Sequence, residues 1–229
     1  MVLLRSSATT AVISRSALAS AAHAAAGSGG SVADLRRDAY GHGLLTVARA
    51  AQDAGIRTML VDGADQISLL HDAGIDATDA GEADVPVRVL YGLNAGARPV
   101  MRLTGHVMSL KDLQPGDAVS YGYTYRAERA TTVALITGGY AQAVVRLLGN
   151  RMDVEISGAL HPIVGRVAMD VCVIEIGDAD GIQEGSEVTF FGGTGPARDA
   201  IDRWSGVTGL GPLELVCAAG LAATQAEED

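Results

Sequence analysis

Apolar residues in the first part of the chain follow two patterns that alternate along the sequence. In three segments they recur every three or four positions, and a glycine that can end a helix follows each segment. Short, mostly apolar runs between and after these segments indicate buried strands. We therefore predict helices over 16–26, 44–54 and 64–73 and strands over 57–61 and 87–91, which alternate as in βα units.

The pattern changes after Arg98, where apolar and polar residues begin to alternate. A period of two is typical of strands with one buried face, and Pro-Gly and Gly-Gly pairs punctuate this part as turns do. We therefore predict two regions, an α/β region over 1–97 and a predominantly β domain over 98–229. The alternation is clearest over residues 101–108, 132–136 and 167–173.

The length of the first region limits the α/β fold that it can form. A closed (β/α)8 barrel takes roughly 250 residues, or about 31 for each βα unit. Residues 1–97 have room for about three units by that measure, and eight cannot fit.

Composition and charge narrow the classes of function. Of the 229 residues 48% are hydrophobic, which is enough for a packed core. The 27 acidic and 17 basic residues give a formal net charge of −10, which disfavours nucleic acid and anionic membranes as partners. No apolar run approaches the roughly 18 residues of a membrane-spanning helix. The scattered histidines have no spacing typical of a metal site.

The cysteines and the N-terminus bear on the compartment. Two cysteines, Cys172 and Cys217, are too few for the disulfide framework of a small secreted protein, which indicates reducing surroundings. The first 33 residues carry arginine and no acid, as targeting peptides do. Their apolar stretches at 2–4 and 11–13 are too short for the core of a secretory signal. We therefore expect a cytoplasmic protein.

Four short motifs carry the candidate chemistry. Asp38–Gly43 has the sequence Asp-Ala-Tyr-Gly-His-Gly at a predicted turn from strand to helix, where helix-terminal N–H groups can hold a phosphate. The other three lie in the predicted β domain, and each alone is more typical of a strand with a packed side chain. They are Val-Ser-Tyr-Gly at 119–122, Gly-Gly-Tyr-Ala at 138–141 and Val-Gly-Arg-Val-Ala-Met-Asp at 164–170.

Taken together and in this order, the motifs resemble those of alanine racemase, the pyridoxal-phosphate enzyme that interconverts L- and D-alanine. Leu-Tyr-Gly-Leu at 90–93, which looks like the end of the last barrel strand, and Arg-Pro-Val-Met at 98–101 extend the resemblance over most of the chain. It implies that residues 1–97 are the remnant of a pyridoxal-phosphate-binding (β/α)8 barrel with about three βα units. It also implies that residues 98–229 form the C-terminal β domain of a dimeric enzyme.

The resemblance also implies roles for individual residues. Tyr121 matches the catalytic tyrosine, which acts as acid and base on one face of the substrate Cα and reaches across a dimer interface into the partner's barrel. Tyr40 matches a hydroxyl that helps hold the cofactor phosphate. Tyr140 matches a tyrosine at the entrance, and Met169 the residue whose backbone N–H meets the substrate carboxylate. Arg36 stands where relatives have the lysine that forms a Schiff base with the cofactor.

Arg36 limits the chemistry that this chain can perform. Racemisation needs a cofactor that delocalises the carbanion and one base on each face of Cα, which in the family are the lysine and the tyrosine. Arginine stays protonated, with a pKa above about 12, and is a poor nucleophile. Arg36 can therefore neither anchor the cofactor nor serve as a ready base. Lys111, the only lysine, lies in a polar stretch that indicates a solvated surface charge.

Three functions are compatible with these residues. The first is a shortened alanine racemase relative, active on alanine as a homodimer if at all, and impaired by the loss of the lysine and of barrel segments. The second is a non-catalytic dimerisation or regulatory partner that pairs with a full-length racemase through the region of Tyr121, Tyr140 and Met169. The third is a decayed gene product with a marginal fold, because three βα units leave sheet edges unpaired.

Overall fold

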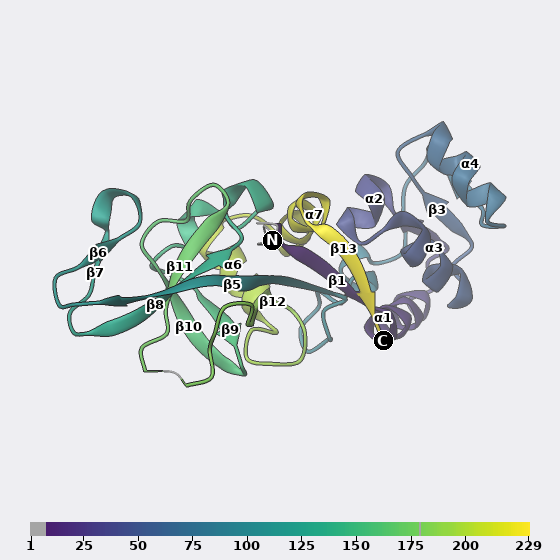
Figure 1. The fold of residues 1–229 in the computed structure, drawn as a ribbon. Helices are drawn as coiled ribbons and strands as arrows, with labels where there is room; N and C mark the ends of the chain where they lie inside the picture. Colours follow the sequence, from purple (N-terminus) through teal and green to yellow (C-terminus); the bar gives the residue numbers. More distant parts are fainter. Residues whose placement is uncertain (1–7, 179) are drawn as a thin grey trace, which may run out of the picture.

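The computed structural model describes residues 8–178 and 180–229. The apolar stretch at 2–4, considered above as part of a targeting signal, lies outside the described residues. An α/β part and a β barrel lie next to each other along the long axis of the molecule (Figure 1).

Six strands of the second half form a closed barrel. Each strand pairs antiparallel with its neighbour, and the last strand of the series returns to the first, because β12 pairs with β5. The β structure that the alternation after Arg98 predicted is therefore confirmed, and it takes the form of a barrel with a buried apolar interior. The strands follow the order β12 (Glu187–Phe191), β9 (Asp153–Ile156), β10 (Ala159–Val164), β11 (Val171–Glu175), β8 (Thr131–Thr137) and β5 (Met101–Leu113).

Two strands near the ends of the chain extend this sheet. β1 (Thr10–Ser14) pairs antiparallel with β5 and parallel with β13 (Thr224–Glu228). Arg102 of β5 forms ion pairs with Glu187 of β12 and Glu228 of β13, at 2.6 and 3.0 Å. Neither β1 nor β13 was predicted, since β1 is too short to show a period and β13 is almost entirely polar.

The α/β part contains a sheet of three parallel strands. The strands β2 (Val32–Asp34), β3 (Thr58–Leu60) and β4 (Ala77–Thr78) are joined by helices that cross from one to the next. The predicted helices are confirmed within two residues, and the predicted strand at 57–61 is confirmed as β3. The helices are α1 (Arg15–Ala26), α3 (Leu44–Asp53) and α4 (Ala64–Asp72).

The prediction of a strand over 87–91 is wrong, because this segment forms the short helix α5 (Val87–Leu90). The carbonyl oxygen of Pro86 accepts hydrogen bonds from the N–H groups of Val89 and Leu90 at 3.0 and 3.1 Å. Proline at the start of a helix is pre-set for helical geometry, and periodicity cannot distinguish a strand from a helix in so short a run. The buried Leu90 belongs to the core, and α5 packs against α1.

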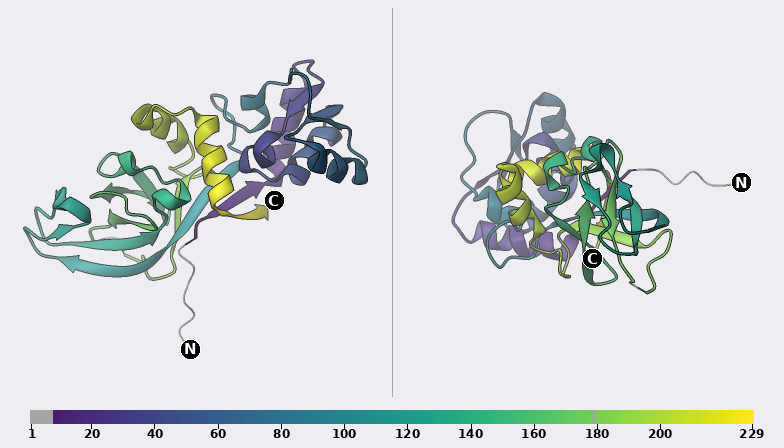
Figure 2. Two further views of the ribbon diagram at one scale, coloured as in Figure 1. Left: turned by 90° about the horizontal axis from the view of Figure 1, so that it is seen from above. Right: turned by 90° about the vertical axis from the view of Figure 1, so that its left-hand side faces the viewer.

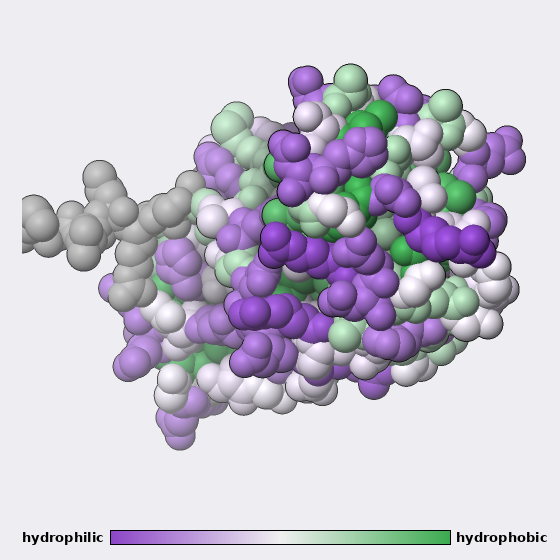
Figure 3. All heavy atoms as spheres, turned by 90° about the vertical axis from the view of Figure 1, so that its right-hand side faces the viewer, coloured by the Kyte–Doolittle hydropathy of each residue, from purple (hydrophilic) through white to green (hydrophobic). Residues whose placement is uncertain are grey.

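The two edges of the three-stranded sheet differ. Beside β2, the N–H groups of Asp84 and Val85 donate to Val32 O at 3.0 and 3.1 Å, so a short extended segment covers this edge. Beside β4, no further strand is paired in the described part of the chain. Viewed from the end that carries α4, the surface is mostly hydrophilic, with apolar residues in small groups between the polar ones (Figure 3).

Two more differences lie in the second half. Residues 167–170, predicted to begin a strand, form a turn before β11. After β12 the chain forms two helices that the alternation did not predict, α6 (Ala200–Thr208) and α7 (Pro212–Ala222). α7 packs against β1 and β5 and against the turn that follows β2, so it lies between the barrel and the α/β part (Figure 2).

Within residues 8–178 and 180–229, no single helix has the length and apolar character needed to cross a membrane. Only α6 and α7 taken together meet that test of length and composition, and they are bent by 104°.

Candidate functional site

The Asp-Ala-Tyr-Gly-His-Gly motif begins in a turn of unusual hand. The segment α2 (Arg36–Gly41) follows β2, and its residues Arg37 to Tyr40 all have φ between 52° and 58° and ψ between 39° and 49°. This left-handed conformation costs about 1–2 kcal/mol for each residue other than glycine. Such strain is typical of functional sites, where the surrounding structure holds it in place. The helix predicted after the motif begins at Leu44, whose N–H donates to Asp38 Oδ1 at 2.8 Å.

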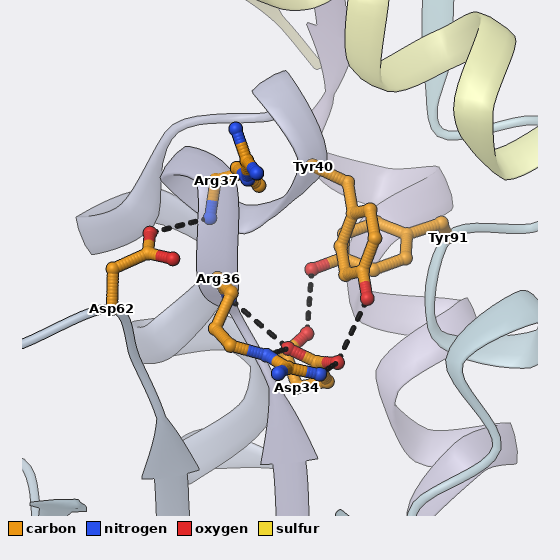
Figure 4. Close-up of polar contacts among 6 residues, drawn as sticks. All are labelled: Asp34, Arg36, Arg37, Tyr40, Asp62 and Tyr91. Carbon is orange, nitrogen blue, oxygen red and sulfur yellow. Dashed lines mark hydrogen bonds and ion pairs between the residues drawn. The ribbon is translucent and has the colours of Figure 1, made fainter. Parts of the chain in front are cut away.

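The left-handed turn gathers polar groups around Asp34, the last residue of β2 (Figure 4). Asp34 Oδ1 accepts hydrogen bonds from the backbone N–H and the Nε–H of Arg36 at 3.1 and 2.9 Å. Oδ2 accepts from Arg36 Nη2 at 2.5 Å and from the hydroxyl of Tyr40 at 2.8 Å. The hydroxyl of Tyr91 donates to the backbone carbonyl of Asp34 at 3.1 Å. Arg36 and Tyr40 therefore share one carboxylate.

The charges in this cluster are set by the same contacts. Burial raises the pKa of the Asp34 carboxyl, but the hydrogen bonds from Arg36 and Tyr40 outweigh burial and leave the pKa below its ordinary value. The hydrogen bond and the charge of Asp34 raise the pKa of Arg36. Burial and the hydrogen bond to Asp34 raise the pKa of Tyr40 to about 12. At neutral pH the cluster is an ion pair with a protonated phenol beside it.

Two further aromatic residues fix the position of Tyr40. Its ring meets the ring of Tyr91 edge to face, with centroids 5.4 Å apart, and His42 lies 4.5 Å from the same Tyr91 ring. His42 Nδ1 bonds the carbonyl oxygens of Ala39 and Tyr40. Burial lowers the pKa of His42 to about 4, so the imidazole is neutral at pH 7.

The second group of predicted site residues lies at the barrel. Tyr121 stands in a short turn between β6 (Ala118–Val119) and β7 (Tyr125–Arg126), and 71% of the residue is exposed. A hollow next to it is lined by Tyr121, Arg166, Ala168 and residues of β11. Ser120 Oγ donates to Arg166 O at 2.5 Å, which ties the Tyr121 turn to the turn at 166–170.

Tyr140 and Met169 are joined to that same turn. The N–H of Tyr140 donates to Ala168 O and the N–H of Ala141 to Met169 O, both at 2.9 Å. The side-chain amide of Gln142 donates to Asp170 Oδ1 at 3.1 Å. Tyr140 is 40% exposed and Met169 54% exposed. The turn at 166–170 therefore links Tyr121, Tyr140 and Met169.

The structure brings the predicted residues together as two separate groups. Arg36 and Tyr40 meet at the end of β2, whereas the strands that flank Tyr121 lie at the opposite end of the molecule from α2 (Figure 1). Lys111 is exposed on β5, paired with Val133 of β8 near the end of the strand that leads to β6. It therefore belongs to the end of the barrel and not to the Asp34 cluster.

Asp34 was not among the predicted residues. One signal for it is present in the sequence, because Asp34 is an acid inside the short apolar stretch 32–35, four residues before the motif. The carboxyl ends of parallel strands are where α/β proteins place their binding residues. Among the described residues no group of three or more His, Cys, Asp or Glu is placed to hold a metal ion. Cys172 is buried and Cys217 half-buried, and burial raises the pKa of both thiols.

Sequence comparison relates more than half of the chain to one family. A family model described as "Alanine racemase, C-terminal domain" matches residues 100–225. Alanine racemase 1 of Clostridium acetobutylicum is 32% identical over 145 residues, which are 59% of this chain and 38% of that protein. The alanine racemase of Desulfovibrio desulfuricans is 32% identical over 189 residues, which are 78% of this chain and 48% of that protein. In both cases the chain spans less than half of the relative's length.

Solved structures show the same fold. The alanine racemase from Streptomyces coelicolor A3(2) superposes with a TM-score of 0.82 at 17% identity, covering 96% of this chain and 98% of that chain. The enzyme from Bartonella henselae, solved with covalently bound pyridoxal phosphate, gives a TM-score of 0.74 at 16% identity, covering 96% of this chain and 99% of that chain. At these identities the likeness concerns the fold alone.

Proposed function

Because the chain belongs to the alanine racemase family, we propose that it is an alanine-racemase-like protein that has kept the tyrosine side of the family site and lost the side that anchors the cofactor. Racemisation of alanine by this chain alone is then impaired. The observation that carries the proposal is the ion pair of Arg36 with Asp34 at the position where the family resemblance expects the lysine.

The residues at the end of β2 do not fit covalently bound pyridoxal phosphate. The anchor position holds a guanidinium that donates to both oxygens of Asp34. Tyr40, the residue expected to hold the cofactor phosphate, donates its hydroxyl to the same carboxylate. Lys111, the only lysine of the chain, lies on β5. The anchor and the second base that racemisation needs are therefore both missing from this group.

The proposal includes the origin of the α/β part as the remnant of a (β/α)8 barrel. Three parallel strands linked by helices, in the order β2, α3, β3, α4 and β4, support it. Asp84 and Val85 lie beside β2, at the edge where the last strand of a closed barrel would stand. We keep 1–97 and 98–229 as the two proposed domains, with β1 pairing with β5 across that boundary.

The tyrosine side supports a second candidate function, that of a partner for a full-length alanine racemase. Tyr121 is exposed, and the two strands that flank it, β6 and β7, lie far from α2 of the same chain (Figure 1). In the family this tyrosine works in the partner's barrel, so a chain that lacks the lysine can still offer Tyr121, Tyr140 and Met169 to another chain. Such a pair, like a homodimer of this chain, would form in the cytoplasm, the compartment predicted from the cysteines.

The first candidate is tested with the purified chain, pyridoxal phosphate and L-alanine. We expect no D-alanine above the enzyme-free blank by chiral chromatography, with the full-length enzyme from Desulfovibrio desulfuricans as the positive control. Turnover that depends on the cofactor and disappears in Tyr121→Phe would refute the proposal.

The second candidate is tested by complementation. A full-length racemase is first inactivated by changing its own catalytic tyrosine to phenylalanine, and this chain is then added. If the chain supplies Tyr121 to the partner's barrel, activity returns with the unchanged chain and stays absent with Tyr121→Phe. Native mass spectrometry of the same mixtures reports whether the heterodimer forms, and exclusive self-association counts against a partner role.

A further inference from the structure

The Asp34 carboxylate contacts Arg36 and Tyr40, the two side chains that the family resemblance places at the cofactor. Three donors of Arg36 and the hydroxyl of Tyr40 bond to its two oxygens. The Asp34 side chain is only 9% exposed, whereas that of Arg36 is 50% exposed. The carboxylate is therefore the buried centre of the cluster, and the arginine lies between it and the solvent.

We propose that Asp34 is a second and independent obstacle to a phosphorylated aldehyde cofactor, so that restoring a lysine at position 36 leaves the site closed until the Asp34 charge is also removed. The inference rests on the proposed function, because it concerns the same loss of cofactor anchoring. It differs in assigning that loss to two residues.

The first reason is the competition for Tyr40. A phosphate oxygen that accepts the proton of the Tyr40 hydroxyl must displace Asp34 Oδ2, which lies 2.8 Å from that hydroxyl. The phosphate would then lie beside an ionised carboxylate in a partly buried place, where like charges repel more strongly than in water. Asp34 therefore opposes the binding of the phosphate even before any covalent step.

The second reason is the state of a lysine at position 36. Covalent attachment condenses a neutral amine with the cofactor aldehyde, forming a C=N bond and releasing one water molecule. An anion that is hydrogen-bonded to the amine favours its charged form and raises its pKa. A lysine that takes over the contact of Arg36 with Asp34 is therefore held as an ammonium ion, which cannot attack the aldehyde.

Other titratable and charged groups surround this cluster, and none of them changes between the two variants at position 36. The groups on α2 are Arg37 and Asp38, and elsewhere in this chain they are His42, Tyr91, Asp62 in the loop after β3 and Cys217 on α7. Asp62 accepts a hydrogen bond from Arg37 N at 2.6 Å, and no hydrogen bond joins it to Arg36 or Tyr40 in the described part of the chain. Asp62→Asn is therefore a control for the loss of one aspartate charge near α2, at an exposed position.

The test of the covalent step compares Arg36→Lys with the double variant Asp34→Asn with Arg36→Lys. Each protein is mixed with pyridoxal phosphate across pH 6 to 10, reduced with borohydride and weighed by mass spectrometry, with peptide mapping to separate position 36 from Lys111. At pH 7.5 we expect at least 10-fold more label at position 36 in the double variant. We also expect the pH at which labelling of that position is half complete to be at least one unit lower in the double variant. Equal midpoints and yields would overturn the inference.

A second measurement needs no lysine and no covalent bond. Pyridoxamine phosphate carries the same phosphate without the aldehyde, and its affinity is measured for Asp34→Asn, Asp62→Asn and the unchanged chain, with circular dichroism to verify folding. We expect binding at least 5-fold tighter in Asp34→Asn alone, and loss of that gain when Tyr40→Phe is added. Equal affinities in the two aspartate variants would contradict the role of Asp34.

The result for the unchanged chain separates this inference from the proposed function. Cofactor-dependent racemisation by the unchanged chain, or stoichiometric borohydride labelling that disappears when the chain is unfolded, would mean that the chain anchors the cofactor after all, and the proposed function would fail. The inference about Asp34 is decided by the differences between variants, whatever the unchanged chain does.

Discussion

The barrel and the α/β part differ in how the edges of their sheets are paired. The barrel closes where β12 meets β5, and β1 and β13 extend it further. The three-stranded sheet has Asp84 and Val85 beside β2 and no paired strand beside β4 in the part of the chain described. Unpaired strand edges are exposed to solvent and to other chains, whereas closure removes them. The barrel is thus complete in itself, and the α/β part depends on its neighbours.

This difference coincides with the division of the candidate site. The Tyr121 group stands on the closed barrel, and the Asp34 cluster stands on the open sheet. The α/β part is attached in part through α7, where an added Cβ at Gly220 would collide with the carbonyl oxygen of Gly41. Close backbone contact of this kind needs glycine. From this comparison we expect the half that carries Tyr121 to remain stable when the anchor half changes.

The largest effect is expected from damage to the barrel core. Trp204 of α6 is 1% exposed and meets Phe191 edge to face, with centroids 5.4 Å apart. Trp204→Ala should lower the free energy of unfolding by about 3–5 kcal/mol, because it leaves a cavity in a packed core. Urea unfolding followed by circular dichroism measures the loss. A loss below about 1 kcal/mol would show that packing around Trp204 contributes little to the stability of the closed barrel.

A second prediction concerns local opening in the two sheets. β8 lies between β5 and β11, whereas β3 is the middle strand of a sheet whose β4 edge is unpaired. Sheets with few neighbours open locally at low free-energy cost. We expect amide hydrogens of β3 to exchange at least about 100-fold faster than those of β8, which corresponds to about 2.7 kcal/mol. Equal exchange rates would mean that α7 joins both parts into one cooperative unit.

The sequence predicted the barrel better than the α/β part for physical reasons that particular residues show. Alternation over 101–108 and 132–136 reports directly on burial of one face, and both stretches form strands. At 87–91 the apolar run was too short to distinguish helix from strand, and Pro86 decided for a helix. β13 is polar, so hydrophobic patterns carry no sign of it. Strands of this kind are held by pairing rather than by their own composition.

The candidate site was predictable only where a motif carried it. Arg36, Tyr40, Tyr121, Tyr140 and Met169 follow from motifs, and their roles remain predictions. The importance of Asp34 depends on the left-handed turn of α2, which folds Tyr40 back onto the end of β2. No local sequence pattern specifies four successive non-glycine residues in that conformation, because each of them disfavours it.

Acid should weaken the α/β part through Asp34 before it affects the barrel. The pKa of Asp34 is lower in the folded chain than its ordinary value. The stability that it contributes is therefore complete above about pH 4, the ordinary pKa of aspartate, and is lost as the pH falls through the folded pKa. Trp204, the only tryptophan, reports on the barrel by fluorescence, and circular dichroism reports on both parts.

The measurement is urea unfolding at pH 7 and at pH 3 for the unchanged chain and for Asp34→Asn. We expect the fall in the free energy of unfolding between pH 7 and pH 3, followed by circular dichroism, to be smaller in Asp34→Asn than in the unchanged chain. The fall followed by Trp204 fluorescence should be the same in both proteins. If the two proteins lose equal stability by both methods, Asp34 contributes nothing that depends on its charge.

The smallest effect is expected from relief of strain in the left-handed turn. Arg37 has φ of 58°, and its N–H donates to Asp62, a contact that glycine keeps. Glycine adopts this conformation without the penalty of about 1–2 kcal/mol, and its greater freedom in the unfolded chain offsets part of the gain. Arg37→Gly should therefore stabilise the α/β part by about 0.5–1 kcal/mol. Arg49→Gly, on the exposed face of the right-handed helix α3, should destabilise it by about 1 kcal/mol. Hydrogen exchange at β3 measures both effects. Slower exchange in Arg37→Gly and faster exchange in Arg49→Gly would confirm that the turn stores strain. Faster exchange in both variants would mean that it does not.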